Sequence, residues 1–341
     1  MKIALLNPPH KFRVSRSSRW PEHTKSGTLY YPFWLAHATG VIQETNHDPL
    51  LLDSIANGWG FQKTIKNLDR FNPDLLVLET STPTLISDLK FAQEYKNEIG
   101  GKVAIVGTHV SALPEETLRL TDAVDFVFRN EFDYTTPELA GVIEKKGKLR
   151  DVQGISYKQD GRIINNPNRK IIQDLDALPF VSPVYNEFLN IQDYRYALAR
   201  HPMIQIKSSR GCPNACTFCN VPQTFTYRKY KTRSPNNFVT ELEWVNDNLP
   251  NVKEIFIEDD TFTINKQRVL DICRLIKNKN LDLTWSANAR ADVPLKVLKT
   301  MKDAGCRMLI IGYESGNQKI LNNVNKGINL NQANEFTKNA K

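Results

Sequence analysis

The sequence has no long hydrophobic run and few cysteines. No stretch of its 341 residues approaches the ~18–20 apolar residues that a helix needs to cross a bilayer, so we predict no transmembrane helix. The opening run Met1–Leu6 is too short for the apolar part of a signal peptide and favours a first β-strand. The five cysteines all lie at or after Cys212, and this small, odd number argues against a disulfide framework. These absences predict a reducing, cytoplasmic location.

Positive charge is in moderate excess, because 45 Lys and Arg residues against 37 Asp and Glu residues give a net charge of +8. Such an excess suits nucleic acid, anionic lipid or a phosphorylated substrate. The basic residues are spread along the chain, however, and the densest group, Tyr227–Arg233, is typical of a solvated face. We therefore expect no nucleic-acid partner.

Aromatic residues gather near the start of the chain, at Trp20-Pro21 and Tyr30–Trp34, together with lysines and arginines. Packing in a hydrophobic core is the simpler interpretation of these rings. The alternative is a lipid-facing surface, which would give the protein a peripheral membrane contact.

Three cysteines in one short loop are the most informative residues present. Cys212, Cys216 and Cys219 have the spacing C-x3-C-x2-C. They are one ligand short of a closed tetrahedral zinc site, and they suit a [4Fe–4S] cluster in which one iron has no protein ligand. A zinc knuckle or a buried thiol cluster is the alternative, and its nearest fourth ligand would be His201, upstream.

The first 147 residues alternate short apolar runs with segments of helical spacing. Five such βα units in succession predict a parallel, doubly wound, Rossmann-like α/β sheet with strands buried on both faces. The expected strands are Lys2–Leu6, Leu50–Asp53, Leu75–Leu78, Val103–Val106 and Ala123–Phe128. The expected helices are Trp34–Glu44, Phe61–Asp69, Leu85–Glu98, Pro114–Leu120 and Thr136–Lys145.

Residues 148–200 are expected to connect two domains. Gly154–Tyr157 and Arg162–Asn165 flank Asp160-Gly161, a dipeptide that favours the tight turn of a β-hairpin. Prolines punctuate the remainder and predict an irregular linker.

From residue 201 to residue 341 the βα alternation resumes, and polar residues follow each expected strand. This pattern predicts a (β/α) barrel, incomplete because only four βα units are present. The expected strands are Met203–Ser208, Val252–Ile257, Leu281–Ser286 and Arg307–Gly312. The expected helices are Phe238–Asn248, Gln267–Lys277, Leu295–Ala304, Gln318–Val324 and Leu330–Ala340.

The run Ser209–Asn220, with Phe218 just before the last cysteine, resembles the radical S-adenosylmethionine (SAM) enzymes. In that family the open iron chelates SAM, and reductive cleavage yields a 5'-deoxyadenosyl radical. A doubly wound domain before such a barrel resembles the cobalamin-binding subclass, which Leu6–Pro9, Thr80–Pro83 and His109–Glu115 match closely.

A narrower similarity points to hopanoid-associated members of that subclass, the group linked with bacteriohopanetetrol cyclitol ether formation. The segments that carry it are Arg129–Asp133, Ala177–Phe180, Arg233–Pro235 and Gly312–Gln318. The resemblance implies either C-methylation or a radical rearrangement or cyclisation of an apolar or lipid-linked substrate. It also implies an external electron donor of the flavodoxin or ferredoxin type.

The resemblance implies a cluster on the three loop cysteines and SAM contacts at the strand ends. Phe218 would lie near the adenine, or pack as an ordinary apolar residue. Glu258, Asp259 and Arg290 are the candidate catalytic residues, although an acidic helix N-cap fits Asp260 equally well. The implied SAM contacts are Phe218, Glu258, Asn288, Arg290, Glu314 and Ser315.

For cobalamin the resemblance is incomplete. Cobalamin domains that ligate cobalt through histidine use D-x-H-x-x-G, whereas Asp53–Gly58 has Ile55 at the histidine position. We therefore expect a base-off corrinoid without a protein imidazole from this loop. Ligands of such a sheet bind beyond the carboxyl ends of its strands. The candidate contacts there are Asn7, Pro8, Thr80, Ser81, Thr82, Gly107, His109 and Glu131.

Other interpretations stay open. His109 either meets the corrin edge or caps its helix, and the first domain is alternatively a scaffold that binds nothing or a flavin site. The whole chain is alternatively a methylthiotransferase-like modifier of RNA or protein, although that group needs amino-terminal cluster cysteines and residues 1–200 have none. Since radical SAM barrels usually have six βα units, the resemblance implies either that the sequence is a fragment or that something else covers the open edge of the barrel. A truncated, non-catalytic corrinoid or iron–sulfur binding protein is therefore a further alternative.

Overall fold

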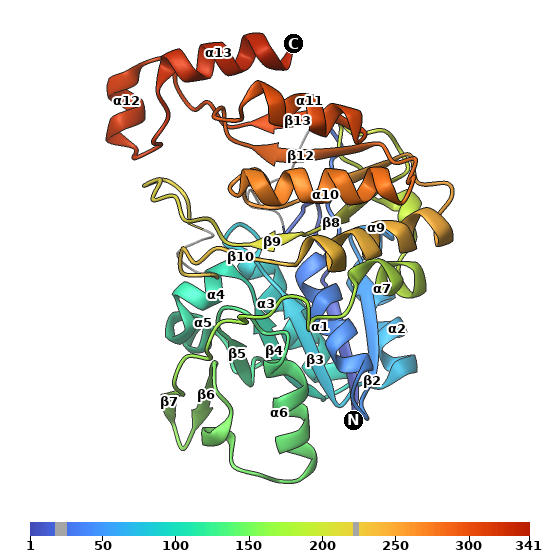
Figure 1. Ribbon diagram of the computed structural model, residues 1–341. Coiled ribbons are helices and arrows are strands. Elements are labelled where there is room, and N and C mark those ends of the chain that lie inside the picture. The colour runs from blue at the N-terminus through green and yellow to red at the C-terminus, as the bar shows by residue number, and fades with distance from the viewer. Residues whose placement is uncertain (18–25, 221–224) are drawn as a thin grey trace. The chain divides into compact units, whose positions relative to one another are not determined.

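The computed structural model describes residues 1–17, 26–220 and 225–341 (Figure 1). These residues divide into two compact units, one made of 1–172 and 178–197 and the other of 173–177 and 198–341. Trp20 and Pro21 lie outside the described residues.

The first unit is built on a seven-stranded sheet in the order β2-β1-β3-β4-β5-β6-β7. The first five strands are mutually parallel, which confirms the doubly wound prediction, and the order reverses between β1 and β3. The strands are β1 (Lys2–Asn7), β2 (Asp48–Asp53), β3 (Leu75–Glu79), β4 (Lys102–Val106), β5 (Phe126–Phe128), β6 (Ile155–Gln159) and β7 (Arg162–Asn165).

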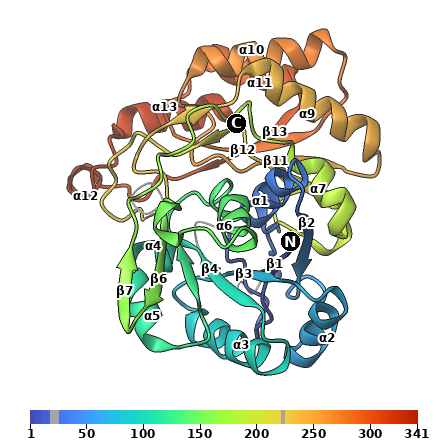
Figure 2. The ribbon, with the colours of Figure 1, turned by 90° about the horizontal axis from the view of Figure 1, so that it is seen from below.

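Helices cover both faces of this sheet, as Figure 2 shows for α1 and α6 on one face and α2 and α3 on the other. The apolar runs of β1, β3 and β4 are fully buried for this reason. The helices are α1 (Phe33–Gln43), α2 (Phe61–Phe71), α3 (Leu85–Glu98), α4 (Thr108–Ala112), α5 (Pro114–Leu120), α6 (Thr135–Glu144) and α7 (Val181–Phe188), with short 3-10 turns at Leu149–Asp151 and Ile191–Asp193.

The predicted hairpin is present and extends the first sheet. Asp160 and Gly161 both have positive φ, as a tight two-residue turn requires, and β6 pairs antiparallel with both β7 and β5. The hairpin therefore belongs to the first unit, and of the expected linker residues 173–177 and 198–200 are grouped with the second.

The described part of the aromatic stretch, Tyr30–Trp34, packs in the core and does not form a lipid-facing surface. Tyr31, Phe33 and Trp34 are buried, and the ring of Tyr31 stacks on Tyr194 with centroids 3.9 Å apart. Core packing, the simpler of the two interpretations, holds for these residues because α1 lies against the sheet and α7.

The second unit contains four parallel strands in the order β13-β12-β11-β8, with α9, α10 and α11 packed in succession. A short antiparallel pair, β9 and β10, follows β8. The strands are β8 (Met203–Ile206), β9 (Ser209–Arg210), β10 (Lys231–Thr232), β11 (Glu254–Ile257), β12 (Trp285–Ala289) and β13 (Cys306–Ile311). The helices are α9 (Pro235–Asn248), α10 (Lys266–Asn278), α11 (Leu295–Asp303), α12 (Gln318–Asn323) and α13 (Leu330–Ala340).

Two strands begin three or more residues later than expected. β5 begins at Phe126 because the side chain of Asp125 accepts a hydrogen bond from the Val103 N–H and pairs with lysines. β12 begins at Trp285, four residues later than predicted, so that Asn288 lies within the strand. Among the described residues, no helix combines the length and apolar character needed to span a bilayer.

Candidate functional site

The cysteine loop begins at the carboxyl end of β8, where backbone geometry is tightly constrained. Gly211 has φ of +84°, and a Cβ there would lie 2.0 Å from the carbonyl oxygen of Lys229. A glycine is therefore required at the point where the chain turns toward Cys212.

The three thiols lie on this one loop and none is in a disulfide. Cys216 is buried, while Cys212 and Cys219 are half-buried. The side-chain amide of Asn214 donates a 3.2 Å hydrogen bond to Cys212 Sγ, and the Cys219 N–H donates to the Cys216 carbonyl. Across the described residues, no three His, Cys, Asp or Glu side chains converge on one metal-binding position. The donor set itself, three soft thiols on a partly exposed loop, fits a cluster.

His201 does not fit as a fourth ligand for zinc. It precedes β8, whereas Cys212 follows the carboxyl end of that strand. A four-residue strand spans ~13 Å, far more than two ligands of one zinc ion can be apart.

Glu258 and Asn288 come together at the carboxyl ends of β11 and β12. Asn288 Nδ2 donates to Glu258 Oε2 at 3.2 Å and to the backbone carbonyl of Asp259 at 3.0 Å. Both side chains are more than nine-tenths buried. Their oxygen and amide groups give the strand ends a hydrogen-bonding site for a polar ligand.

The two aspartates after Glu258 hold the chain that leads to the cysteines. Asp259 accepts hydrogen bonds from Ser208 and Ser209, and Asp260 Oδ2 accepts one from the Gly211 N–H at 3.0 Å. The alternative that Asp260 caps a helix is wrong, because the N-cap of α10 is Asn265.

The loop after α12 contacts the cysteine loop through Lys326, a residue that the sequence analysis missed. Lys326 Nζ lies 2.7 Å from Glu314 Oε1 and 5.9 Å from the ring centroid of Phe218. Arg290 donates to the carbonyl oxygens of Lys326 and Gly327. The one signal in the sequence was the Lys-Gly pair after an expected helix, where glycine commonly ends a helix, and in the structure Gly327 has the positive φ of such a position.

Phe218 and Ser315 differ in their surroundings. The Phe218 ring is 42% exposed, so it is available to stack on a ligand and is not an ordinary core residue. Ser315 is half-buried, and its hydroxyl accepts a hydrogen bond from the Asn317 N–H.

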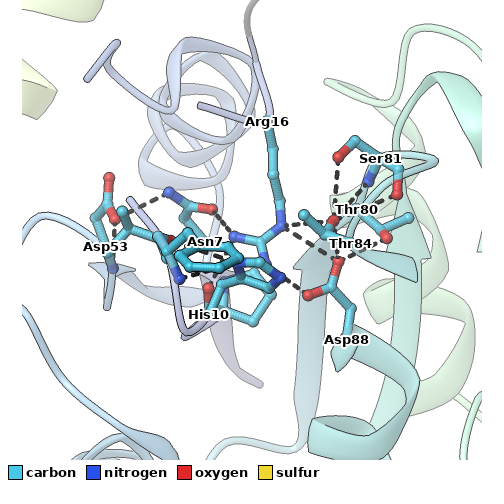
Figure 3. Close-up of polar contacts among 11 residues, drawn as sticks. Asn7, His10, Arg16, Asp53, Thr80, Ser81, Thr84 and Asp88 are labelled. Atoms are coloured by element: carbon cyan, nitrogen blue, oxygen red, sulfur yellow. Dashed lines mark hydrogen bonds and ion pairs between the residues drawn. The ribbon is translucent and has the colours of Figure 1, made fainter. Parts of the chain in front are cut away.

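In the first unit, the guanidinium of Arg16 fills the switch point between β1 and β3 (Figure 3). It donates to Asn7 Oδ1 at 2.7 Å and to the Pro8 carbonyl at 2.8 Å, and it forms a fully buried ion pair with Asp88 at 2.5 Å. The side chains at the centre of this crevice therefore bond to one another.

Thr80 and Ser81 belong to this internal network. Thr80 Oγ1 donates to Asp88, Ser81 Oγ bonds to Thr84 Oγ1, and both residues are at most 1% exposed. Their hydroxyl groups hold α3 to the end of β3. Because these two hydroxyl groups are buried and bonded within the protein, the structure gives no support to the expectation that they bind the nucleotide tail of a corrinoid.

Thr82 and His109 form the accessible part of the same edge. Thr82 Oγ1 and His109 Nδ1 are 3.0 Å apart, and no side-chain cap is made at α4, so His109 does not cap its helix. Burial lowers the pKa of His109, which favours the neutral imidazole. Gly107 has φ of +134°, and a Cβ there would meet the Thr80 carbonyl at 2.1 Å.

Glu131 points inward, since its Oε2 accepts a hydrogen bond from the Ile172 N–H at 2.9 Å. It ties the loop after β5 to the segment that leaves the first unit.

Asp53 is engaged by its own loop and by two side chains from distant parts of the first unit. Its Oδ1 accepts from Asn7 Nδ2, Ile55 N–H and Ala56 N–H, and its Oδ2 accepts from the Tyr194 hydroxyl at 3.0 Å. Burial raises the pKa of Asp53 against the lowering effect of these bonds. Ile55 is buried and apolar, so the position that holds histidine in a D-x-H-x-x-G loop offers no cobalt ligand here.

Two family models match the chain. Residues 206–341 match the radical SAM superfamily, and residues 23–140 match the B12 binding domain.

Three curated proteins are similar over most of the chain. An uncharacterised methyltransferase of Pyrococcus horikoshii is 33% identical over all of the chain and 71% of its own length. The anaerobic magnesium-protoporphyrin IX monomethyl ester cyclase of Synechocystis is 25% identical over 96% of the chain and 64% of its own length. The hopanoid C-3 methylase of Methylococcus capsulatus is 25% identical over 93% and 60%, respectively. The chain thus spans roughly two thirds of the length of these relatives.

A solved structure supports the fold. The cobalamin-dependent radical SAM enzyme OxsB, determined with aqua-cobalamin and SAM bound, superposes with a TM-score of 0.77 at 20% identity, over 99% of this chain and 47% of that one. The strand ends, the cysteine loop and the relative that is similar over the whole chain lead to one conclusion: this chain belongs to the radical SAM superfamily, among the enzymes that also carry a B12-binding domain.

Proposed function

We propose that this chain is the cofactor-binding part of a cobalamin-dependent radical SAM enzyme that methylates, rearranges or cyclises an apolar or lipid-linked small molecule. The observation that carries the proposal is the C-x3-C-x2-C loop at the carboxyl end of β8, in a chain that also matches the B12 binding domain. The family members' cofactors are a [4Fe–4S] cluster, SAM and cobalamin.

Cys212, Cys216 and Cys219 would hold the cluster. When bound, these cofactors supply the electron that cleaves SAM to a 5'-deoxyadenosyl radical and, through the corrinoid, a methyl carrier. The electron originates from an external donor of the flavodoxin or ferredoxin type, and a reducing cytoplasm suits both that donor and the free thiols.

The second unit offers SAM a set of groups with distinct roles. Glu258, with its amide partner Asn288, suits the SAM ammonium, because a buried carboxylate forms strong charge-assisted hydrogen bonds. The exposed Phe218 ring suits the adenine. Lys326 with Glu314, held by Arg290 through the backbone, suits the carboxylate and the ribose hydroxyls, beside Ser315.

In the first unit, Thr82, His109 and the backbone at Gly107 are the groups offered to the corrinoid. Asn7, Pro8 and Glu131 shape the neighbouring loops through their internal bonds. Because Asp53 is satisfied and Ile55 replaces histidine, the corrinoid should bind base-off with no imidazole from this loop.

An apolar or lipid-linked substrate is favoured by the similarity to the hopanoid C-3 methylase and by the narrower sequence resemblance to hopanoid-associated members. Such a substrate would require contact with a membrane surface during catalysis. The proposal includes both methylation and cyclisation, because the relatives include methyltransferases and a cyclase.

The proposal is tested with anaerobically reconstituted protein. We expect iron and sulfide to bind, SAM to be cleaved to 5'-deoxyadenosine, and a corrinoid to bind whose Co(II) EPR spectrum lacks nitrogen coupling. The triple substitution C212A/C216A/C219A should abolish iron binding and SAM cleavage. The matched control C273A/C306A removes the two buried cysteines outside the loop and should retain both. Zinc in place of iron, or SAM cleavage by the triple variant, would refute the proposal.

The substrate class is tested in cells. Deletion of the gene should cause one lipid to accumulate without its methyl group or cyclised side chain, as seen by mass spectrometry of lipid extracts. An unchanged lipid profile with an altered water-soluble metabolite would assign a different substrate class.

A further inference from the structure

Asp259 makes four hydrogen bonds to two consecutive serines. Its Oδ1 accepts from the backbone N–H groups of Ser208 at 2.7 Å and Ser209 at 2.9 Å. Its Oδ2 accepts from the hydroxyl groups of the same residues at 2.6 and 2.7 Å. The side chain is completely buried, and a carboxylate has about four acceptor positions. These four bonds account for its capacity, which leaves Asp259 unsuited to bind the SAM ammonium.

The residues after Asp259 contact the residues after Ser209 in the same order along the chain, up to the first cysteine. After Asp259 engages Ser208 and Ser209, Asp260 accepts from the Gly211 N–H, and Thr261 Oγ1 lies 3.9 Å from Cys212 Sγ. This order follows from the parallel pairing of β8 with β11, in which Ile206 lies opposite Ile257. Side-chain bonds thus extend the register of the two strands up to Cys212.

A buried arginine supports the same serine from the other side. Arg268 Nη1 donates to Ser208 Oγ at 3.1 Å, and its Nη2 donates to the Ser208 carbonyl at 2.9 Å. Arg268 and Asp259 therefore bind the same serine, and the positive charge of the arginine compensates the buried carboxylate.

We propose that Asp259 is a positioning residue: it fixes residues 208–211 so that the Cys212 thiol is presented in one geometry for the cluster. This role rests on the proposed function, because it assumes a cluster on the cysteine loop. Groups that orient a metal ligand commonly change metal affinity about 10- to 100-fold when they are substituted.

The test compares D259N with wild type in the full 341-residue chain. The asparagine keeps the shape and one oxygen acceptor, but its NH2 group cannot accept from the serine hydroxyls. In the apo-protein, alkylation of Cys212 relative to Cys219 should accelerate, as measured by mass spectrometry. In reconstituted protein, iron loss to a chelator should be roughly tenfold faster. SAM affinity per intact cluster should not change.

Two further variants separate positioning from other roles. E258Q, altered one residue earlier, should keep the wild-type rate of iron loss and weaken SAM binding. S208A/S209A should accelerate iron loss less than D259N does. Adding D259N to S208A/S209A should raise the rate of iron loss by a smaller factor than D259N does in wild type, because the hydroxyl partners are already absent.

The proposal is overturned if D259N keeps wild-type alkylation and iron-loss rates, or if it weakens SAM binding while the cluster stays intact. If D259N does not fold, the S208A/S209A variant is used instead. Wild-type rates of alkylation and iron loss in that variant would likewise overturn the proposal. If wild-type protein takes up no cluster, the proposed function fails, but the alkylation comparison on apo-protein still decides whether Asp259 fixes Cys212.

Discussion

Glu79 lies at the carboxyl end of β3, with its carboxyl group almost wholly buried beside two other acids. Ser17 Oγ donates to Glu79 Oε1 at 2.6 Å, whereas Glu79 Oε2 has no hydrogen-bond partner within the described residues. The nearby Arg16 is paired with Asp88. Burial raises the pKa of Glu79 to about 7, and the charges of Asp53 and Asp88 act in the same direction. One guanidinium cannot offset three buried carboxylates, so Glu79 is the group that takes up a proton.

We predict that E79Q flattens the dependence of stability on pH. Because the folded-state pKa lies above the ordinary value of 4.5, the folded protein binds more protons than the unfolded chain between pH 4.5 and about 7. Stability should therefore fall as pH rises through that window, by up to about 3 kcal/mol for this group. Urea denaturation at pH 5 and pH 8 measures the difference, with the exposed E98Q as control. Parallel profiles for wild type and E79Q would contradict the assignment.

At the scale of elements, the cysteine loop depends on the short antiparallel pair β9 and β10. The pair places the Lys229 carbonyl directly against Gly211 Cα, and Thr226 Oγ1 is 3.0 Å from where a Cβ would lie. The Gly211 N–H is bonded to Asp260 from the other direction. Contacts with Lys229 and with Asp260 thus constrain the loop just before its first cysteine.

We predict that G211A disrupts this loop. A left-handed alanine costs about 1–2 kcal/mol, and the overlap with the Lys229 carbonyl adds to it. The variant should unfold at lower denaturant concentration and retain little iron after reconstitution. The matched control is G316A in the same unit, where a Cβ would meet nothing within 4 Å. Wild-type iron content in G211A would show that the loop tolerates a rearrangement.

At the scale of the whole molecule, the chain carries two compact units, each with its own sheet and its own candidate ligands. The B12 match falls in the first unit, and the cysteine loop falls in the second. A ligand that binds only the folded form of one unit stabilises that unit by mass action.

We predict that the units respond separately to their ligands. A corrinoid, either cobinamide, which lacks the nucleotide base, or hydroxocobalamin, should stabilise the first unit by about 2.7 kcal/mol at about 100 times its dissociation constant. Differential scanning calorimetry would show this as an upward shift of one transition. The C212A/C216A/C219A variant should show the same shift, because its substitutions lie in the second unit. The prediction fails if corrinoid stabilisation is absent or requires the cysteines.

Local patterns along the chain were enough to predict the parallel strands of the two larger sheets, and they are the basis on which three loop cysteines are proposed as cluster ligands. Apolar runs of four residues predicted β1, β3 and β4, because a strand buried on both faces is apolar along its length and can be recognised without knowing its partners. The spacing of Cys212, Cys216 and Cys219 is likewise a property of one loop. The hairpin turn at Asp160-Gly161 is local for the same reason.

The tertiary structure alone decided which polar residues at the strand ends are engaged internally. Asp259 meets Ser208 from 51 positions away, and Arg16 meets Asp88 from 72 positions away. Such pairs depend on strand register and on how loops fold back, which no local pattern encodes. For the same reason the sequence analysis named Thr80 as a ligand contact and Asp259 as a candidate catalytic residue, and it did not name Lys326. Residue types at strand ends follow from the sequence, whereas their hydrogen-bond partners follow from distances between segments that only folding brings together.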